Sequence, residues 1–155
     1  KSVKELKELA KQDSISSKSS KTRKSITKEE FYGKEITLSK GENPIDVMLY
    51  HKEGHIKNAF YKDGLGFIDL VWGDENGGLN HLIIQRDKKF NDGIGKITGL
   101  EMANLIPFII ENGVIDEDEK GRLKIEYKDL YRVGVSPSFH NEKVNWIVTA
   151  MEILK

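Results

Sequence analysis

The pattern of apolar and polar positions along the chain predicts a small set of helices and strands. The stretch NPIDVMLYHKEG is typical of a helix, with Asn43 as its N-cap, Pro44 at the first helical position and Gly54 just past its end. Two β-rich runs follow in HIKNAFYKDGLGFIDLVWG and surround Asp63 and Gly64, which predicts a hairpin. The apolar run IDLVW in its second arm predicts a strand near the centre of a sheet.

Two more helices are predicted in the middle of the chain. Residues 78–90 carry an apolar stripe at helical spacing, formed by Leu79, Leu82, Ile83 and Phe90. Residues 98–112 begin with Thr98 and Glu101 in a capping-box pattern and stop at Gly113. Pro107 lies inside this second helix, where we expect it to kink or split the helix.

The C-terminal third is predicted to be a β-meander. An acidic turn, DEDEKGRL, precedes three β-type runs, LKIEY, YRVGVSPSF and VNWIVTAMEIL, and HNEK links the last two as a turn. Helices and a hairpin followed by a meander indicate an α+β fold, in which N-terminal helices and the hairpin pack on a mainly antiparallel sheet.

The N-terminal segment has a different character from the rest. Residues 1–11 have apolar positions at helical spacing, whereas residues 12–28, QDSISSKSSKTRKSITK, are rich in Ser and Lys and read as a flexible linker. Such a basic tail could also contact RNA or an acidic partner. We expect folding to begin between residues 30 and 42, and we divide the chain into a tail at 1–40 and a domain at 41–155.

Composition narrows the functional classes. Cysteine is absent, which excludes disulfides, thiolate zinc sites and a cysteine nucleophile, and no apolar run approaches a membrane span or a signal-peptide core. Of 25 Lys+Arg and 25 Asp+Glu, residues 41–155 hold 14 and 19, a net charge of −5, which leaves +5 for residues 1–40. An acidic body that binds RNA would need a local basic cleft. Because the chain begins with Lys, we expect it to be a piece of a larger polypeptide.

His81 and Arg86 are the first candidates for chemistry. His81 follows a Gly-rich turn and is either a general acid or base or a partly buried histidine satisfied by hydrogen bonds. Arg86 is either a bidentate phosphate ligand or an ordinary exposed helix residue. Five helical residues are about 500°, so the two side chains leave the helix about 140° apart.

Other polar residues give weaker signals. Lys62, Lys57 and Tyr61 flank the first hairpin and either contact phosphate or form a solvated strand edge. Thr149 alternates with apolar neighbours and is either a phosphate ligand or an ordinary β-branched strand residue, and His140 lies in a predicted turn. His51 and His55 have a ligand spacing, but Gly54 interrupts the helix between them, so no metal site is expected. Neither a phosphate-binding glycine loop nor a G-x-S-x-G motif is present.

Together these pieces resemble a known family. AFYKDGLGFIDLVWGDENGGLNHLIIQRDKKF resembles the pattern A-F-x-x-x-G-x-G-x-I-D-L-V-W-G followed by G-L-x-H-I-I-x-x-[HR], and NWIVTAMEIL resembles a closing W-[LIV]-[LIV]-T-[AS]-[FY]-E strand. These patterns mark the phage-associated branch of the barnase–EndoU–colicin–RelE-like (BECR) nucleases. The resemblance runs from about residue 43 to 154.

The resemblance implies a barnase/EndoU-like RNase fold and RNA cleavage without a metal or cofactor. The attacking group would be the RNA's own 2′-hydroxyl, leaving a 2′,3′-cyclic phosphate. His81 matches the family's helix histidine, Arg86 its His/Arg position and Thr149 its strand threonine, and Arg132 would add a second positive charge. Arg86 stands where many relatives have His, and Met151 replaces an aromatic residue, so the second proton-transfer group is open between His140 and Lys62.

The resemblance also implies partners. RNA, including tRNA, would be the substrate of a toxin domain of bacterial or phage origin that acts in the cytoplasm after secretion or delivery. An immunity or antitoxin protein would neutralise it, and no membrane partner is expected. Two alternatives stay open: an inactive binding module that keeps the fold, and a phage structural or assembly domain.

Overall fold

The computed structural model of the chain describes residues 26–139 and 142–154. The chain divides into two compact units, Lys1–Phe31 and Tyr32–Lys155. The short helix α3 (Lys28–Tyr32) starts from a capping box, because the Thr27 N–H donates to Glu30 Oε1 over 2.9 Å and the Glu30 N–H donates to Thr27 Oγ1 over 3.1 Å.

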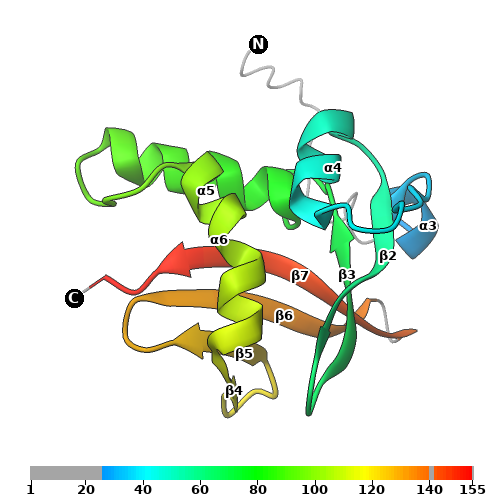
Figure 1. The fold of residues 1–155 in the computed structure, drawn as a ribbon. Helices are drawn as coiled ribbons and strands as arrows, with labels where there is room; N and C mark the ends of the chain where they lie inside the picture. Colours follow the sequence, from blue (N-terminus) through cyan, green and yellow to red (C-terminus); the bar gives the residue numbers. More distant parts are fainter. Residues whose placement is uncertain (1–25, 140–141, 155) are drawn as a thin grey trace. The chain divides into compact units, whose positions relative to one another are not determined.

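The described residues of the second unit form three helices and one six-stranded sheet (Figure 1). The strand order is β2-β3-β7-β6-β5-β4, and every neighbouring pair is antiparallel except β3 and β7, which are parallel. The predicted α+β class with a mainly antiparallel sheet is therefore confirmed. The elements are α4 (Pro44–His51), β2 (His55–Lys62), β3 (Gly66–Val71), α5 (Leu79–Asn91), α6 (Gly99–Asn112), β4 (Val114–Glu117), β5 (Leu123–Tyr127), β6 (Tyr131–Phe139) and β7 (Glu142–Glu152).

The hydrophobic core lies between the sheet and helices α4, α5 and α6, which cover one of its faces (Figure 1). Strand alternation decides which side chains enter it: in β3, Ile68 and Leu70 are in the core, whereas Phe67 and Asp69 point to the opposite face. We call the face turned away from these three helices the distal face. Core side chains from the sheet include Ile56, Ile68, Leu70, Ile125, Val133, Val135, Ile147 and Ala150.

Local sequence signals predicted where helices α4 and α6 begin. The Ile45 N–H donates to Asn43 Oδ1 over 2.8 Å, so Asn43 caps α4 as predicted, although α4 ends at His51 and Lys52 takes the left-handed conformation. Thr98 and Glu101 form the predicted capping box of α6. Pro107 does not split α6, which stays continuous because its buried face packs on the sheet.

Two turns are shorter than the sequence predicted. β4 was missed because only Val114 and Ile115 precede the acidic run, and the acidic turn is confined to the residues between β4 and β5, where the Asp118 N–H donates to Arg122 O over 3.0 Å. Glu142 and Lys143 of the predicted HNEK turn belong to β7, while its other two residues, His140 and Asn141, lie outside the described residues.

The second unit begins with a segment that precedes α4. Tyr32 and Ile36 are buried, and the Ile36 N–H donates to His55 O over 2.8 Å. Within the part of the chain that the structure describes, no helix is both long and apolar enough to cross a lipid bilayer.

Candidate functional site

The loop between β3 and α5 is held tightly by its glycines. Gly73 and Gly78 have φ angles of 74° and 100°, and a Cβ on Gly73 would lie 1.9 Å from Gly77 O. The Asn76 N–H donates to Asp74 Oδ1 over 2.8 Å, closing an Asx turn. This loop therefore presents the start of α5 in a fixed position.

His81 lies in the first turn of α5 and is held by that loop. Its Nδ1 is 2.7 Å from Glu75 O. A carbonyl oxygen only accepts hydrogen bonds, so Nδ1 carries the proton and donates it. The neutral imidazole then has its lone pair on Nε2, which is the arrangement that a general base needs.

Thr149 lies next to a bulge in β7. Val135 pairs with Ile147 and Gly134 pairs with Thr149, so Val148 is the extra residue of the bulge. Ile147 points into the core, and Thr149 points to the distal face, with Gly134 as its cross-strand partner. Gly134 leaves room for Thr149, because a Cβ there would lie 3.1 Å from Thr149 Cγ2.

Arg132 shares the distal face with Thr149 but is already paired. It stands opposite Glu126 on β5, and its Nε donates to Glu126 Oε2 over 2.6 Å. Lys124 Nζ lies 3.7 Å from both Glu126 Oε2 and Asp116 Oδ2. A phosphate that approaches Arg132 has to compete with the carboxylate of Glu126.

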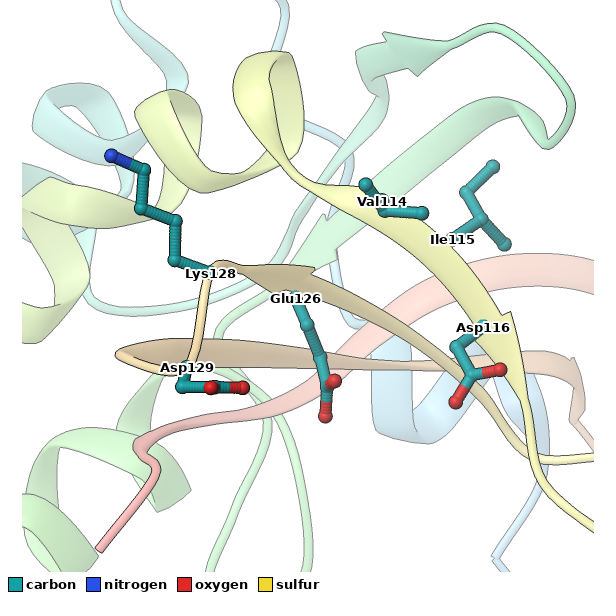
Figure 2. Close-up of a pocket in the computed structure, with 6 residues that line it drawn as sticks. All are labelled: Val114, Ile115, Asp116, Glu126, Lys128 and Asp129. Carbon is teal, nitrogen blue, oxygen red and sulfur yellow. The ribbon is translucent and has the colours of Figure 1, made fainter.

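The edge of the sheet beside this network forms a shallow acidic pocket (Figure 2). Asp116, Glu126 and Asp129 bring their carboxylates to one side, while the ammonium of Lys128 points away from them. Val114 and Ile115 complete the lining. Among the described residues, no group of three or more His, Asp or Glu side chains could hold a metal ion.

Arg86 is directed into the protein. Its residue is 8% exposed and lies on the buried stripe of α5 with Leu79 and Leu82. Burial lowers the pKa of the guanidinium, and attraction to the Glu152 carboxylate opposes that shift. Its Nε has no hydrogen-bond partner among the residues that the structure describes. The side chains of His81 and Arg86 leave α5 in different directions: Arg86 faces the interior, and His81 faces the β3–α5 loop.

The remaining candidates are dispersed. Lys62 Nζ donates to Gly113 O over 2.6 Å and so binds the C-cap of α6. His55 opens β2 and its Nδ1 donates to Gly33 O over 3.1 Å, whereas His51 is exposed at the end of α4. His140 lies outside the described residues.

A buried polar cluster on the distal face was not predicted from the sequence. Asp69 is 5% exposed, accepts the Tyr32 hydroxyl at Oδ2 over 3.0 Å and accepts the Asn58 N–H at Oδ1 over 2.8 Å. Burial, followed by the charge of Asp69, raises the pKa of Tyr32 far above its ordinary value. An aspartate inside the apolar run IDLVW was the signal that could have indicated it.

The chain matches the model of a protein family. The model of a family described as "phage-Barnase-EndoU-ColicinE5/D-RelE like nuclease1" matches residues 59–155, more than half of the chain. The matched segment includes the β3–α5 loop, α5 and β7, and thus His81, Arg86 and Thr149. No curated protein matches the chain.

Proposed function

The chain belongs to the family of phage-Barnase-EndoU-ColicinE5/D-RelE-like nucleases, and from that premise we propose that it is a metal-independent endoribonuclease. The single observation that carries the proposal is the hydrogen bond from His81 Nδ1 to Glu75 O, which leaves Nε2 as the basic nitrogen. A base in a fixed orientation at the edge of a nuclease fold is what 2′-hydroxyl attack requires.

The proposed reaction is an internal transesterification. His81 Nε2 takes the proton from a ribose 2′-hydroxyl, and the 2′-oxygen forms a bond to the adjacent phosphorus. The bond from phosphorus to the 5′-oxygen breaks, and an acid returns a proton to that leaving oxygen. The products are a 2′,3′-cyclic phosphate and a 5′-hydroxyl, with no change in oxidation state.

The other residues are assigned by their positions. The Thr149 hydroxyl on the distal face would donate to a phosphate oxygen, and Arg132 would supply positive charge after exchanging Glu126 for the phosphate. Because Lys62 is bound to Gly113 O, His140 is the favoured candidate for the acid. Arg86 matches the family's His/Arg position, but a guanidinium that is 8% exposed supports the site from the interior.

The biological setting follows from the reaction. The family is phage-associated, which indicates a bacterial or phage origin. A domain that cuts RNA endangers any cytoplasm that contains it, so we propose a toxin that is part of a larger polypeptide and is neutralised by an immunity protein. Its site of action would be the cytoplasm of a target cell, with tRNA among the substrates.

A second function is favoured by the burial of Arg86 and the pairing of Arg132 with Glu126. Both observations fit a binding module that keeps the nuclease fold without activity. The two readings differ in whether His81 is required for the cleavage of RNA.

The deciding experiment is a cleavage assay. The protein is incubated with total RNA and with tRNA, with and without a chelator, beside the variants His81→Ala and His51→Ala. His51 is the matched control because it is exposed on α4. We expect cleavage that survives chelation, persists in His51→Ala and vanishes in His81→Ala. Intact RNA, or equal cleavage by both variants, would overturn the assignment and favour the binding module.

A further inference from the structure

Two aromatic rings stand exposed on the hairpin of β2 and β3. Tyr61 is 58% exposed and Phe67 is 56% exposed, and the two residues are direct cross-strand partners. Their ring centroids lie 5.1 Å apart at an interplanar angle of 68°, in an edge-to-face arrangement. Apolar rings of this size normally gain by burial, so a pair left in water is a candidate contact surface.

The pair lies on the same face as Thr149. Phe67 alternates with Ile68 and shares the distal face with Asp69, which pairs with Trp146 on the parallel strand β7. Phe67 is therefore level with Val144 of β7. Thr149 is five residues further along β7, one of them the bulge residue Val148, so at about 3.3 Å per residue it lies roughly 13–17 Å away.

The hairpin that carries the rings is fixed to the sheet. Asn145 Nδ2 of β7 donates to Leu65 O over 3.0 Å and to Phe67 O over 3.3 Å. The Leu65 N–H also donates to Lys62 O over 2.9 Å, which closes the turn. Because the backbone is already ordered, a ligand that stacks on these rings loses little free energy in ordering them.

We propose that Tyr61 and Phe67 form a base-stacking platform for single-stranded RNA, which rests on the proposed ribonuclease function. Aromatic side chains on a sheet stack bases of any sequence, because every nucleobase has a π-face. Stable protein interfaces bury about 800 Å² on each partner, whereas two rings on a hairpin whose other exposed residues include the polar Lys57, Asn58 and Asp63 offer far less. The platform would hold bases of the same RNA strand, displaced along the strand from the phosphate that reacts near Thr149.

The test measures binding separately from cleavage. A fluorescent, fully 2′-O-methylated single strand cannot be cut by 2′-oxygen attack, and its affinity is read by anisotropy. The double variant Tyr61→Ala/Phe67→Ala is compared with Tyr50→Ala, a tyrosine on α4 that is 83% exposed. We expect the double variant to bind roughly 5- to 100-fold more weakly and Tyr50→Ala to bind like the wild type. A strand of abasic sugars should bind the wild type and the double variant equally.

Each other outcome has a defined meaning. Equal affinity of the double variant, equal loss in Tyr50→Ala, or a wild type that does not bind the methylated strand would overturn the platform. A changed oligomeric state with unchanged RNA affinity would show that the pair contacts a second copy instead. If alanine unfolds the hairpin, Tyr61→Leu/Phe67→Leu keeps apolar side chains without π-faces, and it must show the same loss.

The platform and the nuclease assignment fail in different ways. Wild-type protein that binds the methylated strand through these rings but leaves unmodified RNA intact keeps the platform and refutes the ribonuclease. Cleavage that depends on His81, with affinity that is independent of the two rings, refutes the platform alone.

Discussion

The backbone N–H of Gly78 donates to the carbonyl oxygen of Val148 over 2.9 Å. This bond joins the N-cap of α5 to the bulge residue of β7. His81 lies three residues after Gly78, and Thr149 is the residue after Val148. Gly78 and Val148 are far apart in the sequence, so this contact could not be read from the sequence alone. The proposed base and the proposed phosphate ligand therefore depend on the same backbone contact.

Gly78→Ala should damage both stability and activity. Gly78 has a φ of 100°, and a Cβ would lie 2.8 Å from both Trp72 O and Val71 O, which are rigid backbone atoms. Gly93 is the matched control, with a φ of 78° and no heavy atom within 4 Å of an added Cβ. Urea unfolding should show a loss of about 1 kcal/mol for Gly93→Ala, from backbone strain alone, and of at least about 3 kcal/mol for Gly78→Ala. Equal losses would mean that the loop yields freely.

Arg132→Ala should weaken RNA binding, whereas Arg122→Ala should not. Both arginines donate Nε to a carboxylate oxygen over 2.6 Å, Arg132 to Glu126 and Arg122 to Asp118. Only Arg132 stands on the distal face beside the pair Gly134–Thr149. Glu126→Gln should strengthen binding by up to about 5-fold, because it releases the guanidinium for phosphate. Anisotropy with the 2′-O-methylated strand measures all three variants, and stronger or unchanged binding in Arg132→Ala would remove it from the site.

The sequence predicted the elements that depend on local signals. Asn43, Thr98 and Gly113 mark helix ends through bonds to near neighbours, and the hairpin around Asp63 and Gly64 is decided by turn chemistry. The continuity of α6 through Pro107 could not be predicted, because packing on the sheet opposes the local preference there. β4 is short, and its pairing with β5 is what makes it a strand.

The arrangement of the candidate site depended on contacts between distant segments. Helical spacing predicted that His81 and Arg86 would diverge, but not that Arg86 would be buried near Glu152. The partner of Arg132 is Glu126, six residues earlier in the chain, and the two meet only through the register of β5 and β6. The tautomer of His81 is decided by a carbonyl in the preceding loop, which residue types alone do not reveal.

Arg86→Ala should act through stability. The change removes a buried side chain and leaves the carboxylate of Glu152 without its nearby cation, although Glu152 still accepts the N–H of Lys96 over 3.0 Å. We expect a loss of about 3 kcal/mol in the free energy of unfolding. Lys88→Ala, on the exposed side of α5, should cost less than about 0.5 kcal/mol. Chemical unfolding and RNA cleavage per folded molecule are both measured. We expect the cleavage per folded molecule to stay unchanged in Arg86→Ala. A fully folded variant that has lost cleavage would instead restore Arg86 as a phosphate ligand.

Tyr32→Phe should destabilise the second unit and change its response to alkali. The variant removes the hydroxyl that donates to Asp69 Oδ2 over 3.0 Å, so a buried carboxylate oxygen loses that bond, at a cost of about 1.5–3 kcal/mol. Because folding raises the pKa of Tyr32 above its ordinary value of 10.0, the unfolded chain releases this proton at lower pH than the folded protein does. The stabilisation that comes from the raised pKa of Tyr32 is present in full below pH 10 and is lost as the pH rises further. Urea unfolding between pH 8 and about 11 should therefore show a smaller alkaline decline in Tyr32→Phe than in the wild type, while Tyr50→Phe, at an exposed tyrosine, keeps the wild-type decline. Identical declines in both variants would show that another group controls unfolding in alkali.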